Sequence, residues 1–141
     1  MAMGKRGERQ RSMWIATEQL PRARGHVFYD AVNEILKTEG FDRFAERECV
    51  HCYKSETIGR PSIAPGVYFR MVMIGYFEDI DSERGIAWRC ADSVSLKQFL
   101  GFELAESTPD HSMSRTRRLI DVETHSRILT GCCRFWPNTG W

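Results

Sequence analysis

Two cysteines in the segment CVHC, residues 49–52, have the spacing of half a zinc site. A structural zinc ion needs four ligands, and no second Cys-x-x-Cys pair follows, because Cys90 and His111 are isolated in the sequence. Cys49 and Cys52 also fall on the apolar stripe of a predicted helix, where reduced cysteine is readily buried. We therefore interpret both as buried thiols and predict neither a metal site nor a cofactor.

Clusters of basic residues are the second feature that could carry chemistry, because phosphate groups respond to local positive charge. Lysine and arginine number 20 against 19 acidic residues, which gives a formal net charge of +1. That near-neutral total hides one basic cluster near the N-terminus and another in the last third of the chain. The candidate DNA-binding residues in these clusters are Lys5, Arg6, Arg9, Arg11, Arg115, Arg117 and Arg118.

Length and composition are those of a single soluble globular domain. The chain has 141 residues, of which 42% are hydrophobic and 28% charged, and such a length supports one modest core. The most apolar segment, PGVYFRMVMIGYF, is shorter than the ~20 residues that cross a bilayer and contains Arg70. Five cysteines, an odd number, do not form a disulfide framework, and no secretory signal is present. The expected location is cytoplasmic, without a membrane partner.

Helical periodicity dominates the chain, and no segment has the pattern of a strand. Apolar residues recur at helical spacing from Phe28 to Leu36 and again from Phe41 to Cys52. A third helix, residues 65–78, is apolar nearly all round and is predicted to be the buried centre of a bundle. Residues 1–24 are predicted to be a basic, flexible arm. The predicted fold class is all-α, a small helical bundle.

A helix-turn-helix-like unit is predicted in the second half of the bundle. Two short helices, residues 83–91 and 95–100, precede a break at Gly101. A long helix is then predicted to begin at Pro109 and to run to residue 129. In a helix-turn-helix arrangement this third helix lies in the major groove of DNA.

The predicted third helix has an apolar inner face and a basic outer face. The inner face holds three residues: Met113, Thr116 and Ile120. Arg115 and Arg118 point elsewhere and are available to phosphates or to guanine edges. The alternative is a solvated basic face whose arginines form salt bridges with Asp121 and Glu123.

Two long motifs carry a resemblance to a known family. Residues 60–89 read RPSIAPGVYFRMVMIGYFEDIDSERGIAWR, and residues 108–120 read TPDHSMSRTRRLI. Both resemble motifs of the N-terminal, InsH-type domain of bacterial insertion-sequence transposases of the insertion-sequence-five group. The resemblance covers residues 26 to 129, although the family has one more residue near Met113 and the match ends after about Ser126.

The resemblance implies a helical domain that binds the terminal inverted repeats of a mobile element. In the family, a ribonuclease-H-like catalytic domain follows, with an Asp-Asp-Glu triad that holds two Mg²⁺ ions for strand cleavage and transfer. None of that domain is present here. The acidic residues that do occur, Asp79, Asp81 and Glu83, lie at a predicted helix start, where helix capping accounts for them. We carry over no catalytic residue and expect no enzymatic activity.

The final segment, residues 130–141, departs from both the helical pattern and the family. When its codons are read one nucleotide earlier, the overlap of Cys132 with Cys133 must encode leucine. The overlap of Phe135 with Trp136 must also encode leucine, and that of Trp136 with Pro137 must encode alanine. If Arg134 uses a CG-type codon, the whole tail can read WVLSVLAEHGL, an apolar helical segment such as the family carries there. We interpret residues 130–141 as a frameshifted tail that truncates the domain formed by residues 25–129.

These observations predict a non-catalytic DNA-binding domain of a transposase whose partner is double-stranded DNA at element ends. Intact transposase or a second copy of the chain are further expected partners. One alternative is a helical protein-interaction or oligomerisation module, because residues 67–80 carry more apolar side chains than a small bundle must bury. The other is an inert product of a decayed transposase gene.

Overall fold

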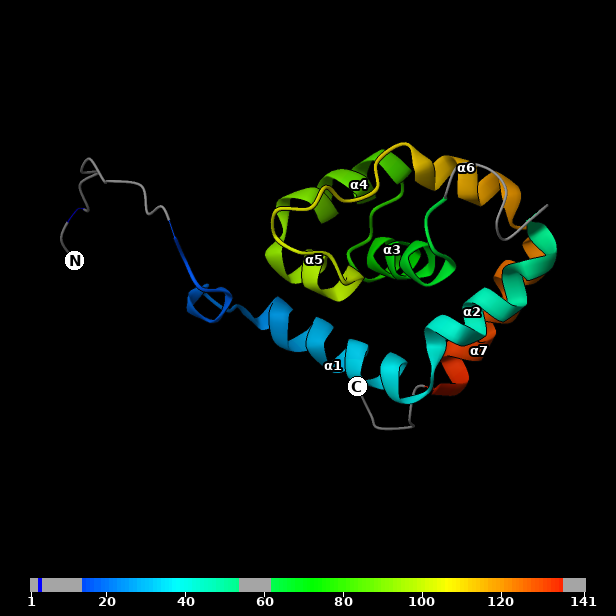
Figure 1. Cartoon of the computed structure of the whole chain (residues 1–141), viewed down its shortest axis with the longest axis horizontal. Helices are drawn as coiled ribbons and strands as arrows, with labels where there is room; N and C mark the ends of the chain where they lie inside the picture. Colours follow the sequence, from blue (N-terminus) through cyan, green and yellow to red (C-terminus); the bar gives the residue numbers. More distant parts are fainter. Residues whose placement is uncertain (1–2, 4–13, 54–61, 136–141) are drawn as a thin grey trace.

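The chain folds into a helical bundle, shown as a computed structural model that describes residues 3, 14–53 and 62–135 (Figure 1). The described residues contain no strand, which confirms the predicted all-α class. The helices are α1 (Arg24–Thr38), α2 (Phe41–Cys49), α3 (Pro65–Phe77), α4 (Glu83–Asp92), α5 (Val94–Leu100), α6 (Ser112–Leu119) and α7 (Val122–Phe135), with the 3₁₀ helices η1 (Thr17–Gln19) and η2 (Val50–Cys52).

Helix α3 is the centre of the bundle, as its nearly continuous apolar sequence predicts. It is seen end-on in Figure 1, surrounded by other helices, and contacts α2, α4 and α5. Tyr68, Phe69, Met71 and Ile74 are almost completely buried, whereas Tyr76 is 85% exposed. The apolar abundance that favoured an interaction module is therefore used mainly inside the bundle.

Arg70 is the buried charge of α3, with 5% of the residue exposed. Its guanidinium forms an ion pair with Asp42 of α2 and donates to the side-chain oxygen of Asn33 at 3.3 Å and to the carbonyl of Gly66 at 3.3 Å. Gly66 leaves room for this ion pair, because a Cβ atom there would collide with the Asp42 carboxylate where it now lies. The ion pair thus fixes the close approach of α2 to α3.

The two predicted N-terminal stripes form the faces of α1 and α2 that turn inward. On α1 the buried residues are Tyr29, Val32 and Leu36, so Tyr29 joins a stripe that the sequence predicted around Phe28. Gly40, at φ 64°, separates the helices, because a left-handed residue ends α1 without a steric penalty for glycine. On α2 the buried residues are Phe41, Ala45 and Cys49.

The predicted long helix from Pro109 to residue 129 is wrong, because the chain forms two helices there. Residue Ile120 is extended, at φ −86° and ψ 124°. Asp121 then caps α7, since its carboxylate accepts a hydrogen bond from the backbone N–H of Thr124 at 2.8 Å. Hydrogen bonds from Thr124 also hold the pKa of the Asp121 carboxyl well below its usual value. The chain thus leaves the helical conformation at Ile120, whose side chain is buried, and Asp121 starts the next helix.

Helix α7 does not end at residue 130, where the sequence predicted that the helical pattern is lost. Helix α7 continues to Phe135, and the Phe135 ring packs edge-to-face on Phe44 of α2 with centroids 5.8 Å apart. A Cβ atom on Gly131 would lie 2.8 Å from the Phe44 ring, so the glycine allows α7 to approach that ring closely. Cys132 is half-buried, whereas Cys133 is exposed. Residues 136–141 lie outside the described part of the chain.

No helix in the described part of the chain is both long enough and apolar enough to cross a membrane. Of the predicted basic arm, Lys5, Arg6, Arg9 and Arg11 lie outside the described residues. Within the remainder of the arm, η1 contains no buried residue, and Trp14 is 90% exposed.

Candidate nucleic-acid interface

Helix α6 forms a corner of the bundle between α4 and α7 (Figure 1). Its inner face is the predicted one, because Met113 and Thr116 are buried, and Ile120 is buried directly after the helix. The hydroxyl of Thr116 donates to the carbonyl of Ser112 at 3.1 Å, so this buried polar group is satisfied. Burial on one side leaves the opposite side of α6 to solvent.

Glu83 of α4 anchors α6 at its flank. Its carboxylate accepts a hydrogen bond from the Ser114 hydroxyl and one from Arg117 at 2.9 Å. The bond from Ser114, then the bond from Arg117, lower the pKa of the Glu83 carboxyl, and the nearby charge of Arg118 lowers it further. Of the three arginines, Arg117 is therefore committed in part to holding α6 against α4.

Arg115 and Arg118 form the free basic face of α6. Both are exposed, and neither forms an ion pair with another described residue. Residues three apart on a helix share a face, so the two guanidinium groups can contact the same ligand. The alternative prediction, salt bridges from these arginines to Asp121 and Glu123, is not met among the described residues. Arg117 pairs with Glu83 instead, and Asp121 pairs with His51.

A hollow lies beside this face, between α6 and the start of α3. Arg115 is one of its lining residues, together with apolar residues from three segments. Those residues include Ile63, Val67, Phe102, Pro109 and Leu119. Arg115 thus lines this hollow, while Arg118 lies three residues further along the exposed face.

Replacement of Glu83 by glutamine is expected to lower the free energy of unfolding by about 1 kcal/mol at neutral pH, because a charged acceptor is lost in a partly exposed site. Glu83 has a lowered pKa in the folded protein. Its stabilisation is therefore present above the usual carboxyl pKa and is lost as the pH falls through the folded-state value. Urea unfolding of the wild type and of Glu83→Gln at neutral and acidic pH measures this pH dependence of stability.

The matched control for that prediction is Glu34→Gln, since Glu34 is exposed on α1 and has no ion pair with another described residue. It is expected to change stability by less than about 0.5 kcal/mol. A difference between wild type and Glu83→Gln that stays constant down to strongly acidic pH would contradict the assignment.

The predicted helix-turn-helix connection is long in the structure. Helices α4 and α5 are separated by Ser93 alone, whereas residues 101–111 connect α5 to α6. A helix-turn-helix turn has about three or four residues. Helix α6 contacts α4, so it is the packing against α4, more than a tight turn, that holds the arginines in place.

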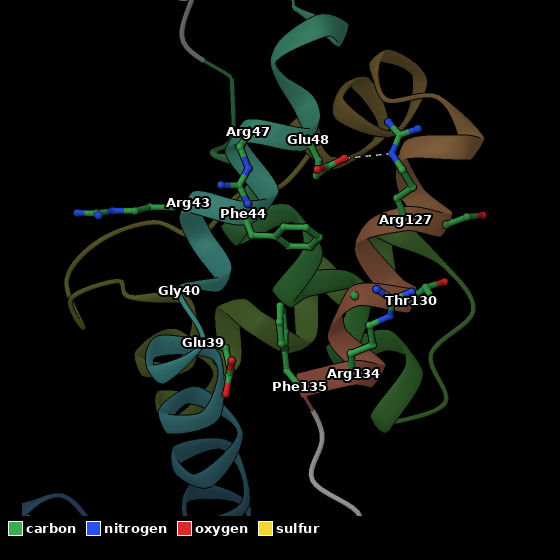
Figure 2. A pocket seen from close by; sticks show the side chains of 12 residues that line it. Glu39, Gly40, Arg43, Phe44, Arg47, Glu48, Arg127, Thr130, Arg134 and Phe135 are labelled. Atoms are coloured by element: carbon green, nitrogen blue, oxygen red, sulfur yellow. Dashed lines mark hydrogen bonds and ion pairs between the residues drawn. The ribbon is translucent and has the colours of Figure 1, made fainter.

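A second basic surface, which the sequence did not single out, lies in the groove between α2 and α7 (Figure 2). Its basic residues are Arg43, Arg47, Arg127 and Arg134, and its acidic ones are Glu39 and Glu48. Arg127 donates to Glu48 at 3.0 Å, while the Arg47 guanidinium lies 6.0 Å from the ring centroid of Phe44. The i, i+4 spacing of Arg43 and Arg47 on the outer face of α2 was the available signal.

The cysteines of CVHC have different environments. Cys49 is buried as predicted, and burial raises the pKa of its thiol to about 11. Cys52 lies in η2, outside the α2 stripe, and is only half-buried where it packs against the core, so the prediction of a buried thiol is wrong for Cys52. Cys90 is buried, and burial raises its pKa to about 12.

His51, Cys52 and Asp121 are the described residues whose ligand atoms converge closely enough to hold a metal ion.

Comparison with known protein families identifies the family of the chain. A family model described as a transposase domain (DUF772) matches residues 16–119, which is more than half of the chain. No curated protein and no solved structure matches significantly.

Proposed function

Because the chain belongs to this transposase-domain family, we propose that it is the non-catalytic DNA-binding domain of an insertion-sequence transposase of the insertion-sequence-five group, InsH-type. Its ligand is double-stranded DNA in the terminal inverted repeats of the element. The observation that carries the proposal is the exposed pair Arg115 and Arg118 on α6, neither of which forms an ion pair with another described residue.

The setting of α6 supports this function because a DNA-reading helix must be rigid relative to the rest of the domain. Two buried residues and the bond from Arg117 to Glu83 anchor it. Arginine contacts phosphates and also pairs with two atoms of guanine. Arg115 and Arg118 therefore have the chemistry for positioning and for sequence recognition. Arg117, already bound to Glu83, is assigned a smaller share of the contact.

The acidic residues near the start of α4 have structural surroundings in the described part of the chain, and we assign them no part in catalysis. Two-metal phosphoryl transfer needs carboxylates that converge on ions about 4 Å apart. Asp79, Asp81 and Glu83 do not form such a group among the described residues. Glu83 is instead engaged by Ser114 and Arg117, and Asp79 and Asp81 are exposed beside the start of α4.

A titration of the full chain with an inverted-repeat duplex at several salt concentrations tests the proposal. We expect log K to fall linearly with log salt, with a slope of about −0.9 for each phosphate that an arginine or lysine contacts. A scrambled duplex is expected to bind more weakly while keeping the salt dependence. A binding constant that does not respond to salt would contradict DNA binding.

The frameshift remains a proposal about the gene, supported by the codon overlaps at Cys132–Cys133 and Phe135–Trp136. The nucleotide sequence from the Ser126 codon through the bases beyond the stop tests it. We expect the shifted frame to continue into a chain with spaced Asp, Asp and Glu. A shifted frame that closes at once would show that residues 130–141 are a native ending.

A further inference from the structure

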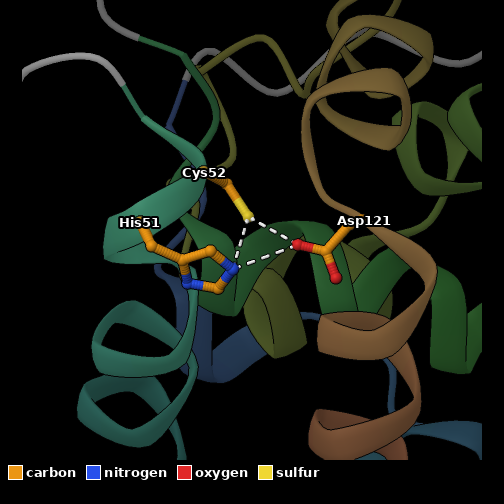
Figure 3. Close-up of side chains that lie close together, drawn as sticks. All are labelled: His51, Cys52 and Asp121. Carbon is orange, nitrogen blue, oxygen red and sulfur yellow. Dashed lines mark hydrogen bonds and ion pairs between the residues drawn. The ribbon is translucent and has the colours of Figure 1, made fainter.

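His51, Cys52 and Asp121 meet at the point where the end of α2 faces the corner between α6 and α7 (Figure 3). The Nε2 atom of His51 lies 3.1 Å from Oδ2 of Asp121 and 3.5 Å from Sγ of Cys52. The Sγ atom of Cys52 lies 3.3 Å from the same Asp121 oxygen. Three different ligand atoms thus form a small triangle, although Asp121 is about 70 residues distant along the chain.

The size of this triangle matches the face of a zinc tetrahedron. With zinc bonds of about 2.0 Å to nitrogen and oxygen and about 2.3 Å to sulfur, tetrahedral angles place nitrogen about 3.3 Å from oxygen and sulfur about 3.5 Å from either. The observed separations of 3.1, 3.3 and 3.5 Å are close to these values. A small movement of the side chains therefore suffices for all three to bind one ion.

The surroundings supply the support that metal ligands require. Thr124, which is fully buried, donates its backbone N–H to Oδ1 of Asp121 at 2.8 Å and its hydroxyl to Oδ2 at 2.9 Å. Hydrogen bonds from neighbouring groups orient a carboxylate that binds a metal ion. The side chains of His51 and Asp121 are about half exposed, at 56% and 48%, so an ion can enter and a water molecule can occupy the fourth position.

We propose that His51, Cys52 and Asp121 bind Zn²⁺, with water as the fourth ligand. The ion ties η2 to Asp121, the cap of α7, and so fixes the corner at which α6 ends. Cys49 is not a ligand, because its sulfur is not part of the converging group. This site goes beyond the proposed DNA binding and does not depend on it, because each ligand comes from outside the arginine face.

Titration of the reduced full chain with Co²⁺ tests the site directly, because cobalt reports on a thiolate ligand by its absorption. We expect one Co²⁺ per chain, a sulfur-to-cobalt charge-transfer band, and displacement of cobalt by Zn²⁺. Cys52→Ser is expected to abolish the band, while Cys133→Ser, which removes an exposed thiol elsewhere, keeps it. Absence of the band in the wild type, or its survival in Cys52→Ser, would overturn the proposal.

Asp121→Asn separates zinc binding from folding, because asparagine caps a helix as well as aspartate does. We expect unchanged helix content by circular dichroism and Zn²⁺ affinity at least about tenfold lower, measured by calorimetry. The matched control is His111→Gln, since His111 forms a similar pair with Asp110 at 3.2 Å outside the cluster. It is expected to bind Zn²⁺ like the wild type. Wild-type affinity in Asp121→Asn would contradict the site.

Discussion

Replacement of Asp42 by alanine is expected to lower the free energy of unfolding by about 2–3 kcal/mol, because it leaves the Arg70 charge buried without a carboxylate. The side chain of Arg70 is 6% exposed, whereas that of Asp42 is 56% exposed. The guanidinium also lies 5.6 Å from the ring centroid of Phe41 and 5.7 Å from that of Phe99. These two rings and the neutral oxygens that accept hydrogen bonds from Arg70 replace only part of the stabilisation that the ion pair provides.

Two further variants make this prediction specific. Arg70→Met removes the charge and keeps much of the volume, so we expect it to cost less than Asp42→Ala, since no buried charge is stranded. Asp30→Ala is the matched control, because Asp30 pairs with Arg22 at the surface, where such pairs contribute about 0–1 kcal/mol. Urea unfolding followed by circular dichroism measures all three. An equal decrease in the free energy of unfolding for Asp42→Ala and Asp30→Ala would show that the burial of Arg70 does not add to the contribution of its ion pair.

Simultaneous replacement of Arg115 and Arg118 by alanine is expected to weaken DNA binding by about tenfold or more at low salt and to reduce the salt slope by about two. Both residues are exposed, so the change should leave helix content and the unfolding midpoint nearly unaltered. Loss of discrimination between the inverted repeat and a scrambled duplex would place one of them on a base edge.

The matched control for the arginine pair is Arg43→Ala with Arg47→Ala, which removes the same charge from the groove between α2 and α7. We expect this variant to keep most of the affinity and of the salt slope. If it instead loses more affinity than the α6 variant, DNA lies across the second groove, and the assignment of α6 as the DNA-contacting helix is wrong. Fluorescence anisotropy with one duplex and one salt series compares both variants with the wild type.

Local sequence patterns predicted the all-α class and most of the helices, because burial on one side of a helix repeats every three or four residues. The continuous apolar run of α3 indicated the centre of the bundle, and Gly40 and Gly101 marked helix ends that the structure places at φ 64° and 84°. The inner face of α6 was also predictable, because Met113 and Thr116 lie three residues apart. Family membership followed from long motifs that are contiguous in sequence.

Tertiary structure alone decided which helices face one another, because periodicity gives the buried side of a helix and not its neighbour. The pairing of Arg117 with Glu83 separates one arginine from the other two on α6, although composition makes them alike. The break at Ile120, whose side chain is buried in the core, was not marked by any change in the helical periodicity. The approach of Asp121 to His51 and Cys52 likewise joins residues about 70 positions apart, a distance that no local spacing rule can span.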